Sequence, residues 1–322
     1  MLSTLNVATI IEPVRDIRIK ETNRCSWDCK WCHHEGSNID RDLQLSSYML
    51  GFLSLMRKEL GINTLHLTGG EPTLHPNLQD HIQAYTEMGF EVSVTSNGCK
   101  PMIWPLLYEA GLKGANFSLH TLDTVSFASF HQDHRTEEWA RKALQNTCDS
   151  IKTAQSIGLG AKVNTTITDS SSDWKPIYEF CKQEGVPLRI QNELNSPYAL
   201  AAIDEMIHSV NGKLLKIIKK GATSRISYEY EDRDGYCFRV KLIAPANLEN
   251  LCSSCPIKDR CTEGFYTIRL EPAAAKDTFE IRLCLHRTDN GTVFSPDEFI
   301  GSAVFSELKK IYCGQFNISH LN

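Results

Sequence analysis

Residues 24–34 of this 322-residue chain read Arg24-Cys25-Ser26-Trp27-Asp28-Cys29-Lys30-Trp31-Cys32-His33-His34. The three cysteines have the spacing C-x3-C-x2-C and follow directly on a short apolar run that is typical of a strand. Three thiolates from one short loop can converge on a single metal centre. Zinc needs a fourth ligand, such as His33 or His34, whereas an iron–sulfur cube held by three thiolates leaves one iron open to a small molecule. The spacing favours the cluster; zinc and buried packing cysteines are the alternatives.

Outward from this loop, short apolar runs alternate with helical patterns between residues 16 and 191, as in the βα units of a parallel sheet. The predicted strands are 17–19, 64–67, 91–95, 115–119, 161–165 and 187–190. The predicted helices lie near 45–60, 77–88, 102–110, 141–157 and 174–184. Six such units exceed what a small doubly wound sheet needs. We therefore predict an α/β fold, a partial (β/α)6 TIM-like barrel whose chemistry gathers at the carboxyl ends of its strands.

The pattern changes after residue 200. A predicted helix near 203–220 is followed by predicted antiparallel strands and a terminal helix. These strands are 226–231, 237–243, 265–271 and 279–285, and the helix is 303–313. We therefore expect two domains, the barrel in residues 1–200 and a smaller C-terminal module in residues 201–322.

Composition excludes several classes of protein. The chain has 34 Lys+Arg against 39 Asp+Glu, a net charge of −5, which argues against a sequence-independent nucleic-acid binder. No apolar run approaches the roughly 18 residues of a membrane span, and the N-terminus lacks the pattern of a signal peptide. We expect a cytoplasmic protein without nucleic-acid or membrane partners. Its 12 cysteines are then packing residues, nucleophiles or metal ligands.

A second group of cysteines lies in the C-terminal part. Cys252 and Cys255 form a C-x2-C pair, Cys261 follows six residues later, and a predicted hairpin returns Cys284 to them. This arrangement suits a four-thiolate iron–sulfur site, with a four-cysteine zinc knuckle as the alternative.

Three further motifs end the second, third and fourth predicted strands. They are Leu67-Thr68-Gly69-Gly70-Glu71-Pro72, Thr95-Ser96-Asn97-Gly98 and Asn116-Phe117-Ser118-Leu119. Gly69 and Gly70 allow the backbone to approach a ligand where a Cβ would clash. Glu71 supplies a carboxylate for an ammonium group.

Together with the cysteine triplet, these motifs resemble the radical S-adenosylmethionine (radical SAM) superfamily. The resemblance implies a [4Fe–4S] cluster on the three cysteines and bound SAM, which is cleaved to methionine and a 5′-deoxyadenosyl radical. It places Trp31 beside the adenine, Glu71 near the methionine amino group and Ser118 against SAM. The residues that it assigns to SAM are Trp31, Gly69, Gly70, Glu71, Pro72, Thr95, Ser96, Asn97, Ser118 and Leu194.

Within this superfamily the chain resembles the MoaA family, the GTP cyclases of molybdenum-cofactor biosynthesis. The resemblance implies that Arg18 and Lys162 contact the substrate's phosphates and that the C-terminal part is a Twitch-type module. That module would hold a second [4Fe–4S] cluster on Cys252, Cys255 and Cys284, with Cys261 as a fourth ligand. It also implies an electron donor such as flavodoxin or ferredoxin.

Departures from that family lie where the substrate would be recognised. His66 stands in place of an Arg, His120 in place of an Asp and Leu194 in place of a Met, and the family's closing Gly-Gly tail is absent. Cys261, if it is a ligand, closes the second cluster to substrate. We expect His66 and His120 to contact another small molecule, with phosphorylated or nucleotide-like compounds as first candidates. The GTP cyclase activity, the radical modification of a ribosomal peptide and a zinc-stabilised binding module without catalysis remain alternatives.

One further cysteine is a candidate catalytic residue. Cys237 alternates with Phe238 along a predicted strand and shares a face with Arg239 and Lys241. If that face looks into the barrel mouth, the Cys237 thiol is positioned to donate a hydrogen atom to a substrate radical.

Overall fold

The computed structural model describes residues 7–33, 40–133, 135–194, 196–275, 278–289 and 291–313. Within these ranges the strands form one sheet in the order β1-β8-β9-β10-β7-β6-β5-β4-β3-β2-β11-β12-β13. The strands of the barrel are β2 (Asp16–Thr22), β3 (Thr64–Gly69), β4 (Glu91–Ser96), β5 (Gly114–Ser118), β6 (Gly160–Ile167) and β7 (Leu188–Asn192). The others are β1 (Ala8–Glu12), β8 (Lys213–Lys220), β9 (Arg225–Glu231), β10 (Cys237–Ile243), β11 (Arg269–Pro272), β12 (Phe279–Arg282) and β13 (Val293–Phe294).

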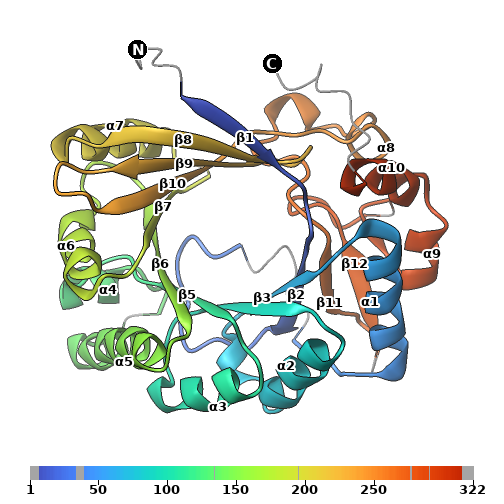
Figure 1. The fold of residues 1–322 in the computed structure, drawn as a ribbon, viewed down its shortest axis with the longest axis horizontal. Helices are drawn as coiled ribbons and strands as arrows, with labels where there is room; N and C mark the ends of the chain where they lie inside the picture. Colours follow the sequence, from blue (N-terminus) through green and yellow to red (C-terminus); the bar gives the residue numbers. More distant parts are fainter. Residues whose placement is uncertain are drawn as a thin grey trace.

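Strands β2 to β7 are parallel neighbours, and each is followed by at least one helix. These helices are α1 (Ser47–Leu60), α2 (Leu78–Glu87), α3 (Trp104–Glu109), α4 (Thr124–Ser129), α5 (Glu137–Ser156), α6 (Trp174–Glu184) and α7 (Ala199–Ser209). Figure 1 shows the sheet curled into a ring with helices α1 to α7 outside it. The prediction of an α/β fold with a partial TIM-like barrel of six βα units is therefore confirmed.

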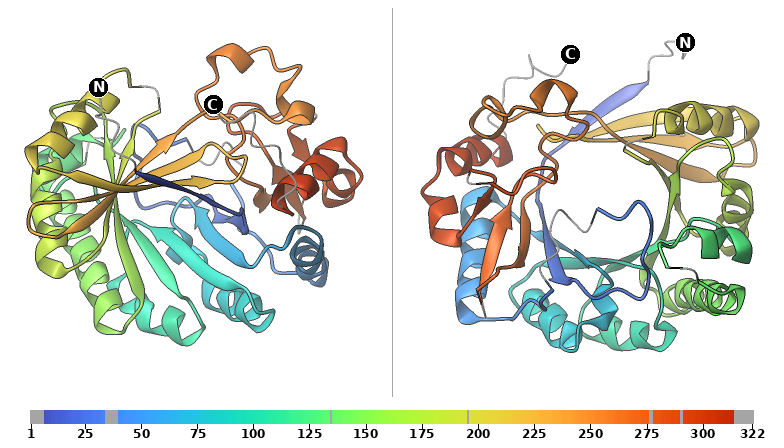
Figure 2. Two further views of the ribbon diagram at one scale, coloured as in Figure 1. Left: turned by 45° about the horizontal axis from the view of Figure 1, so that its top comes forward. Right: turned by 180° about the vertical axis from the view of Figure 1, so that it is seen from behind.

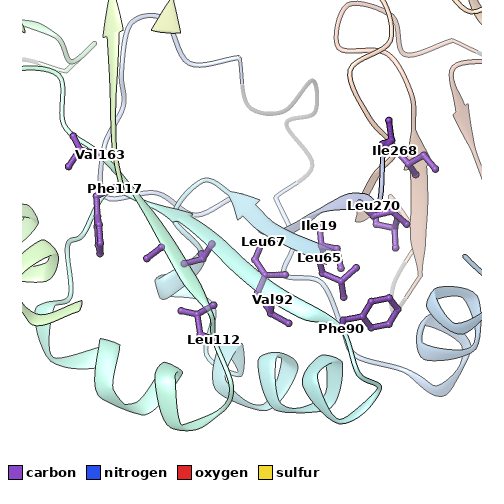
Figure 3. Packing of buried hydrophobic residues seen from close by; sticks show 14 of the residues in the cluster. Ile19, Leu65, Leu67, Phe90, Val92, Leu112, Phe117, Val163, Ile268 and Leu270 are labelled. Carbon is purple, nitrogen blue, oxygen red and sulfur yellow. The ribbon is translucent and has the colours of Figure 1, made fainter. Parts of the chain in front are cut away.

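The strands divide their residues between the two faces of the sheet. Leu65 and Leu67 of β3 are 0% exposed and belong to the core that the helices cover (Figure 3). His66 alternates with them and lines the inside of the ring. Since side chains of a strand point alternately to its two faces, one apolar face packs on the helices while the opposite face builds a polar interior.

The predicted helix near 203–220 is wrong beyond residue 209. Helix α7 ends at Ser209, Asn211 takes a positive φ of 53°, and the chain continues as β8. Strand β8 pairs with β1 on one side and with β9 on the other. These two ladders outweigh the weak helical preference of the Lys- and Leu-rich segment, since tertiary context overrides propensity.

The strands that follow residue 200 extend the same sheet at both of its ends. Strand β10 pairs with β7 in parallel and with β9 in antiparallel, whereas β11 pairs with β2. Figure 2 shows these additions closing much of the ring that β2 to β7 begin. The remaining helices, α8 (Glu249–Cys252), α9 (Pro296–Ile300) and α10 (Ala303–Tyr312), lie beside β12 and α1 (Figure 1). No helix in the described ranges has both the length and the apolar character needed to cross a bilayer.

Candidate active site

A cavity of ≈ 1160 Å³ is lined by the inner face of the curled sheet and by the loop of the three cysteines. Of the residues that the sequence singles out, those that line it are Arg18, Cys25, Cys29, Trp31, Cys32, His66, Gly69, Gly70, Thr95, Ser96, Asn97, Ser118, His120, Lys162 and Leu194. In Figure 1 the segment after β2, which carries the cysteines, crosses the middle of the ring. Nearly all residues that the sequence assigns to SAM and substrate therefore line the same cavity.

The cysteine loop is held by the segment that joins α4 to α5. Lys30 donates its backbone N–H to the carbonyl oxygen of Phe130 at 2.9 Å. Trp27 packs edge-on against Phe127, with ring centroids 5.0 Å apart. Because these partners belong to a different βα unit, the position of the loop depends on the closure of the barrel as well as on its own sequence.

Asn97, which directly follows β4, links the cysteine loop to a second motif. Its Nδ2 donates to Ser26 Oγ at 3.0 Å and lies 3.9 Å from Cys25 Sγ. Burial raises the pKa of the Cys25 and Cys29 thiols to about 12, because a thiolate loses solvation there. Three thiols on one cavity wall, whose protons a metal displaces, form the donor set of a three-thiolate cluster.

Gly69 and Gly70 lie against the base of the cysteine loop. A Cβ on Gly69 would stand 2.3 Å from Thr22 O, and one on Gly70 would stand 2.3 Å from Arg24 O. Gly70 also donates its N–H to Thr22 O at 2.8 Å. The prediction that these glycines admit a ligand is thus incomplete, since the atoms that a Cβ would meet belong to the neighbouring chain segment.

The structure does not leave the Glu71 carboxylate open to an ammonium group. Glu71 is 0% exposed, and its Oε1 accepts from the Thr73 N–H at 3.0 Å and from Ser96 Oγ at 2.8 Å. Its Oε2 accepts from the Asn97 N–H at 2.5 Å. Burial raises the pKa of this carboxyl, although these donors oppose the rise. Glu71 therefore ties the glycine turn to the end of β4, and neither it nor Pro72 lines the cavity.

A buried network behind the cysteine loop has no signature in the sequence. His81 Nδ1 lies 2.8 Å from Glu21 Oε2, and Tyr85 donates to Glu21 Oε1 at 3.4 Å. His75 lies beside them, so that Glu21, His75 and His81 each place one potential ligand atom within 4.8 Å of the others. Both ring nitrogens of His75 already have backbone partners. The group is therefore a hydrogen-bond network between β2 and α2, without a free lone pair on His75 for a metal.

Trp31 and His120 meet in the lining of the cavity. Their rings are perpendicular, with centroids 5.3 Å apart. His120 Nδ1 accepts the backbone N–H of Thr166 at 3.2 Å, and burial lowers the pKa of His120 to about 4. A neutral His120 therefore exposes its other nitrogen, Nε2, as a donor. His66 also lines the cavity. Its Nδ1 lies 2.8 Å from Ser93 Oγ, and its Nε2 lies 2.8 Å from Thr95 Oγ1.

Basic side chains also line this cavity. Arg18 and Lys162, which the resemblance selects, are joined there by Arg189 and Lys241. Burial lowers the pKa of both Lys162 and Lys241, since the ammonium form loses solvation. Sequence reasoning missed Arg189 as a site residue. The available signal was a charged residue at an inner-face position of a strand whose other face, at Leu188 and Ile190, is fully apolar.

Tyr266, also missed, projects among these cations. It precedes β11 and lines the cavity, and Lys241 Nζ donates to its phenol oxygen. The other two arginines of this region have carboxylate partners. Arg225 pairs with Asp16 at 2.7 Å, and Arg269 with Glu263 at 3.0 Å.

The structure does not bring Cys237 to the cavity. Cys237 is exposed, is the first residue of β10 and is not among the lining residues. Because β10 runs parallel to β7, its first residue lies at the amino end of the barrel strands, away from the cysteine loop. The prediction of a thiol facing the barrel mouth is corrected accordingly.

The second cysteine group lies around one small pocket in the C-terminal part of the chain. Cys252, Cys255, Cys261 and Cys284 all line this pocket. Cys252 is buried, while the other three are partly exposed. The Gly264 N–H donates to Cys261 Sγ at 3.2 Å. Cys261 therefore faces the same pocket as the other three thiols.

Comparison with known proteins agrees with this geometry. The model of the radical SAM superfamily matches residues 19–176. A probable GTP 3′,8-cyclase of Sulfolobus acidocaldarius is 36% identical over 170 residues, which is 52% of this chain and 51% of that protein. A probable GTP 3′,8-cyclase of Methanothermobacter thermautotrophicus is 24% identical over 86% of both chains. The match to the first relative thus spans only about half of its length.

Solved structures support the fold. The crystal structure of Streptococcus suis SuiB superimposes with a TM-score of 0.58 over 96% of this chain and 68% of that chain, at 14% identity. At this identity the likeness concerns the fold alone. The superfamily match, the cyclase relatives and the cysteine triplet on the cavity wall agree on one conclusion: residues 19–176 of this chain match the radical SAM superfamily.

Proposed function

We propose that this enzyme uses SAM to abstract a hydrogen atom from an anionic small molecule bound inside the barrel. The observation that carries the proposal is a single cavity that both groups line. The three thiols follow the carboxyl end of β2, whereas the basic Arg18, Lys162 and Arg189 lie in the amino-terminal halves of β2, β6 and β7. A [4Fe–4S] cluster on Cys25, Cys29 and Cys32 would supply the electron that cleaves SAM to methionine and a 5′-deoxyadenosyl radical. The protein's own task is to position the two ligands and to exclude side reactions.

Other residues of the cavity lining fit SAM. Trp31 offers an aromatic face for the adenine, and the glycine turn lines the wall next to the cysteine loop. Ser118 and Asn97 add polar groups at neighbouring strand ends. We propose that the backbone of the glycine turn, and not the Glu71 carboxylate, meets the methionine end of SAM, because Glu71 is fully engaged by Thr73, Ser96 and Asn97.

The basic side chains of the cavity support an anionic substrate. Lys162 and Arg189 lie on adjacent strands, and burial lowers the pKa of both because each loses hydration. The charges of Arg189 and Arg239 add to the lowering for Lys162, and those of Arg18 and Arg239 add to it for Arg189. A phosphate or carboxylate would relieve this repulsion and accept charge-assisted hydrogen bonds. His66 and His120 line the same cavity and are the uncharged groups that we propose contact the rest of the substrate.

We propose a second cluster on Cys252, Cys255, Cys261 and Cys284, held by the module that residues 201–322 form. Four thiols on one pocket would saturate its irons, so the substrate would be held by side chains only. The strand order supports a second cluster close to the substrate site, since β11 follows the second cysteine group in the chain and pairs with β2 at Arg18. We also propose the cytoplasm as its compartment, where thiols stay reduced, and flavodoxin or ferredoxin as its electron donor.

GTP is the runner-up substrate, since the curated relatives reported above are GTP 3′,8-cyclases. The position of Cys261 and the replacement of charged family residues by His66 and His120 favour a different anionic molecule. Conversion of GTP to the cyclised nucleotide would decide for the cyclase.

The test is SAM cleavage by protein purified without oxygen. We expect this protein to contain about eight irons per chain. When a low-potential reductant is added, it should release 5′-deoxyadenosine from SAM. Cleavage should accelerate when a phosphorylated small molecule that binds the cavity is added. Cys29→Ala should abolish cleavage, whereas Cys313→Ala, a change in an exposed thiol on α10's end, should not. Colourless protein that contains zinc and leaves SAM intact would overturn the proposal.

A further inference from the structure

Tyr266 is surrounded by positive charge on several sides. Lys241 Nζ lies 4.6 Å from the centroid of its ring and donates to its phenol oxygen. The guanidinium carbons of Arg18, Arg225 and Arg269 lie 5.7, 5.2 and 5.5 Å from the same centroid. The side chain is only 7% exposed and lines the substrate cavity. Nearby positive charges favour the ionised form of a phenol over the neutral form.

The backbone around Tyr266 fixes the ring in this position. Phe265, the preceding residue, donates its N–H to Ala246 O, and its carbonyl accepts the N–H of Ser224 at 2.8 Å. On the other side, Thr267 Oγ1 donates to Asp16 O at 3.1 Å. The backbone on both sides of Tyr266 is therefore tied to neighbouring segments of the sheet.

The ionisation of Tyr266 follows from its neighbours. Burial would raise the pKa of the phenol, but the charges of Lys241, Arg18 and Arg225 outweigh burial and lower the pKa to about 7. The charged and titratable groups that face this region are Asp16 and Arg18 from β2, Arg189 from β7, Arg225 from β9, Lys241 from β10, Arg269 from β11, Glu263 from the loop before β11 and Tyr312 from α10. Asp16 and Glu263 are already paired with arginines. When ionised, the Tyr266 phenolate is therefore a counter-ion to Lys241.

We propose that Tyr266 is a proton-coupled recognition residue, whose phenolate yields its cations to the anionic group of the substrate and takes up one proton as that group binds. The inference rests on the proposed function and specifies its substrate as an anion. The proton comes from solvent, an O–H bond forms at the Tyr266 oxygen, and no electron moves. Binding of an anion and protonation of Tyr266 are then reciprocally coupled, so each favours the other.

Sulfate tests this coupling, because it is a dianion that does not titrate near neutral pH. Sulfate is titrated calorimetrically into the anaerobic, SAM-loaded holoenzyme at a series of pH values from about 7 to about 9. One proton taken up predicts that Kd weakens by about tenfold per pH unit. Tyr266→Phe should bind sulfate with a Kd that is nearly independent of pH over this range. Tyr228→Phe, a change on β9 outside the cavity lining, should behave as the wild type.

A second variant guards against misfolding of Tyr266→Phe. Lys241→Met removes the cation that contacts the phenol, so the pH window of the coupling should move upward while Tyr266 remains. Three results would each overturn the inference. The first is that sulfate does not bind, and the second is that the Kd of the wild type does not change with pH. The third is a pH dependence that persists in Tyr266→Phe, because Lys162 or Lys241 would then be the titrating group. SAM cleavage measured on the same samples separates the two proposals: cleavage without the coupling removes only this inference, and no cleavage removes the proposed function.

Discussion

His81 Nδ1 lies 2.8 Å from Glu21 Oε2, at a place where the two side chains are 3% and 0% exposed. Glu21 belongs to β2, four residues before the first cysteine of the cluster loop, and His81 belongs to α2, the helix that follows the glycine turn. The contact therefore joins the strand that leads into the cysteine loop to the helix that follows the glycine turn. A hydrogen bond this deeply buried is costly to break on one side only.

His81→Ala should weaken both the fold and the first cluster. The change leaves Glu21 with Tyr85 as its remaining side-chain donor, so the free energy of unfolding should fall by about 1–3 kcal/mol. Urea denaturation of the anaerobic protein measures this loss, and iron analysis should show reduced loading. His208→Ala, at an exposed position of α7, is the control. Wild-type values for His81→Ala would mean that the network does not support the loop.

Glu71→Gln distinguishes two roles for this residue. The Glu71 oxygens accept from Thr73, Ser96 and Asn97, and the amide NH₂ of Gln would face one of these donors. We expect the free energy of unfolding to fall by about 1–3 kcal/mol, together with a loss of SAM affinity as Asn97 shifts. Denaturation and calorimetry measure the two effects. A loss of SAM affinity at unchanged stability would instead support a direct contact between Glu71 and the ammonium group.

Cys261→Ala should affect only the second metal site. Cys261 shares its pocket with Cys252, Cys255 and Cys284. Because three thiolates can still hold an iron–sulfur cube with one open iron, the variant should keep most of its iron, whereas the electron paramagnetic resonance spectrum of the second cluster should change. The first cluster should still cleave SAM to 5′-deoxyadenosine. The matched change Cys313→Ala should leave the iron content and this spectrum unaltered. If Cys261→Ala kept all its iron and an unchanged electron paramagnetic resonance spectrum, Cys261 would not be a ligand.

Asp232→Asn should remove a pH-dependent part of the stability. Burial alone would raise the pKa of Asp232, but bonds from Lys182 at 2.7 Å and Tyr178 at 2.6 Å outweigh it and hold the pKa well below the ordinary 3.8. A carboxyl with a lowered pKa stabilises the fold above the pKa it has when unfolded, and this stabilisation is lost as the pH falls. The variant should therefore lose about 1–3 kcal/mol near neutral pH, and the difference should shrink only below about pH 4.

Urea denaturation at several pH values, followed by circular dichroism, measures the difference between Asp232→Asn and the wild type. Asp234→Asn is the matched control, because Asp234 also contacts Lys182 but has a side chain that is 55% exposed. An exposed pair contributes little to stability, so this variant should stay close to the wild type at every pH. A loss that grew as the pH fell would contradict the assignment.

Local patterns were sufficient for the barrel. The alternation of Leu65 and Leu67 with His66 predicts a strand with one apolar and one polar face, and β3 has this form. The same reasoning failed for the segment after Ser209, because the pairing of β8 with β1 and β9 is made by residues far away in sequence. Whether a Lys- and Leu-rich run becomes a helix or a strand depends on neighbours that no local window contains.

The candidate site divides in the same way. Cys25, Cys29 and Cys32 lie within eight residues of one another, so their convergence follows from loop length alone. Two other features depend on how the strands pair in the sheet. They are the hydrogen bond from the Asn97 N–H to Glu71 and the position of Cys237 outside the cavity lining. Spacing along one segment carries no information on such contacts.

The sequence by itself determined the βα alternation and the position of the cysteine loop after β2, because both depend on residues within one turn, loop or strand. The members of the second cysteine group line one small pocket in the structure. Only the tertiary structure decided which side chains face one another across the barrel. The clearest case is Tyr266 with Lys241, two residues on separate elements whose contact places a phenol among cations. Charge and burial act through space, so their effect on the pKa of Tyr266 arises only when the sheet has curled and brought these residues together.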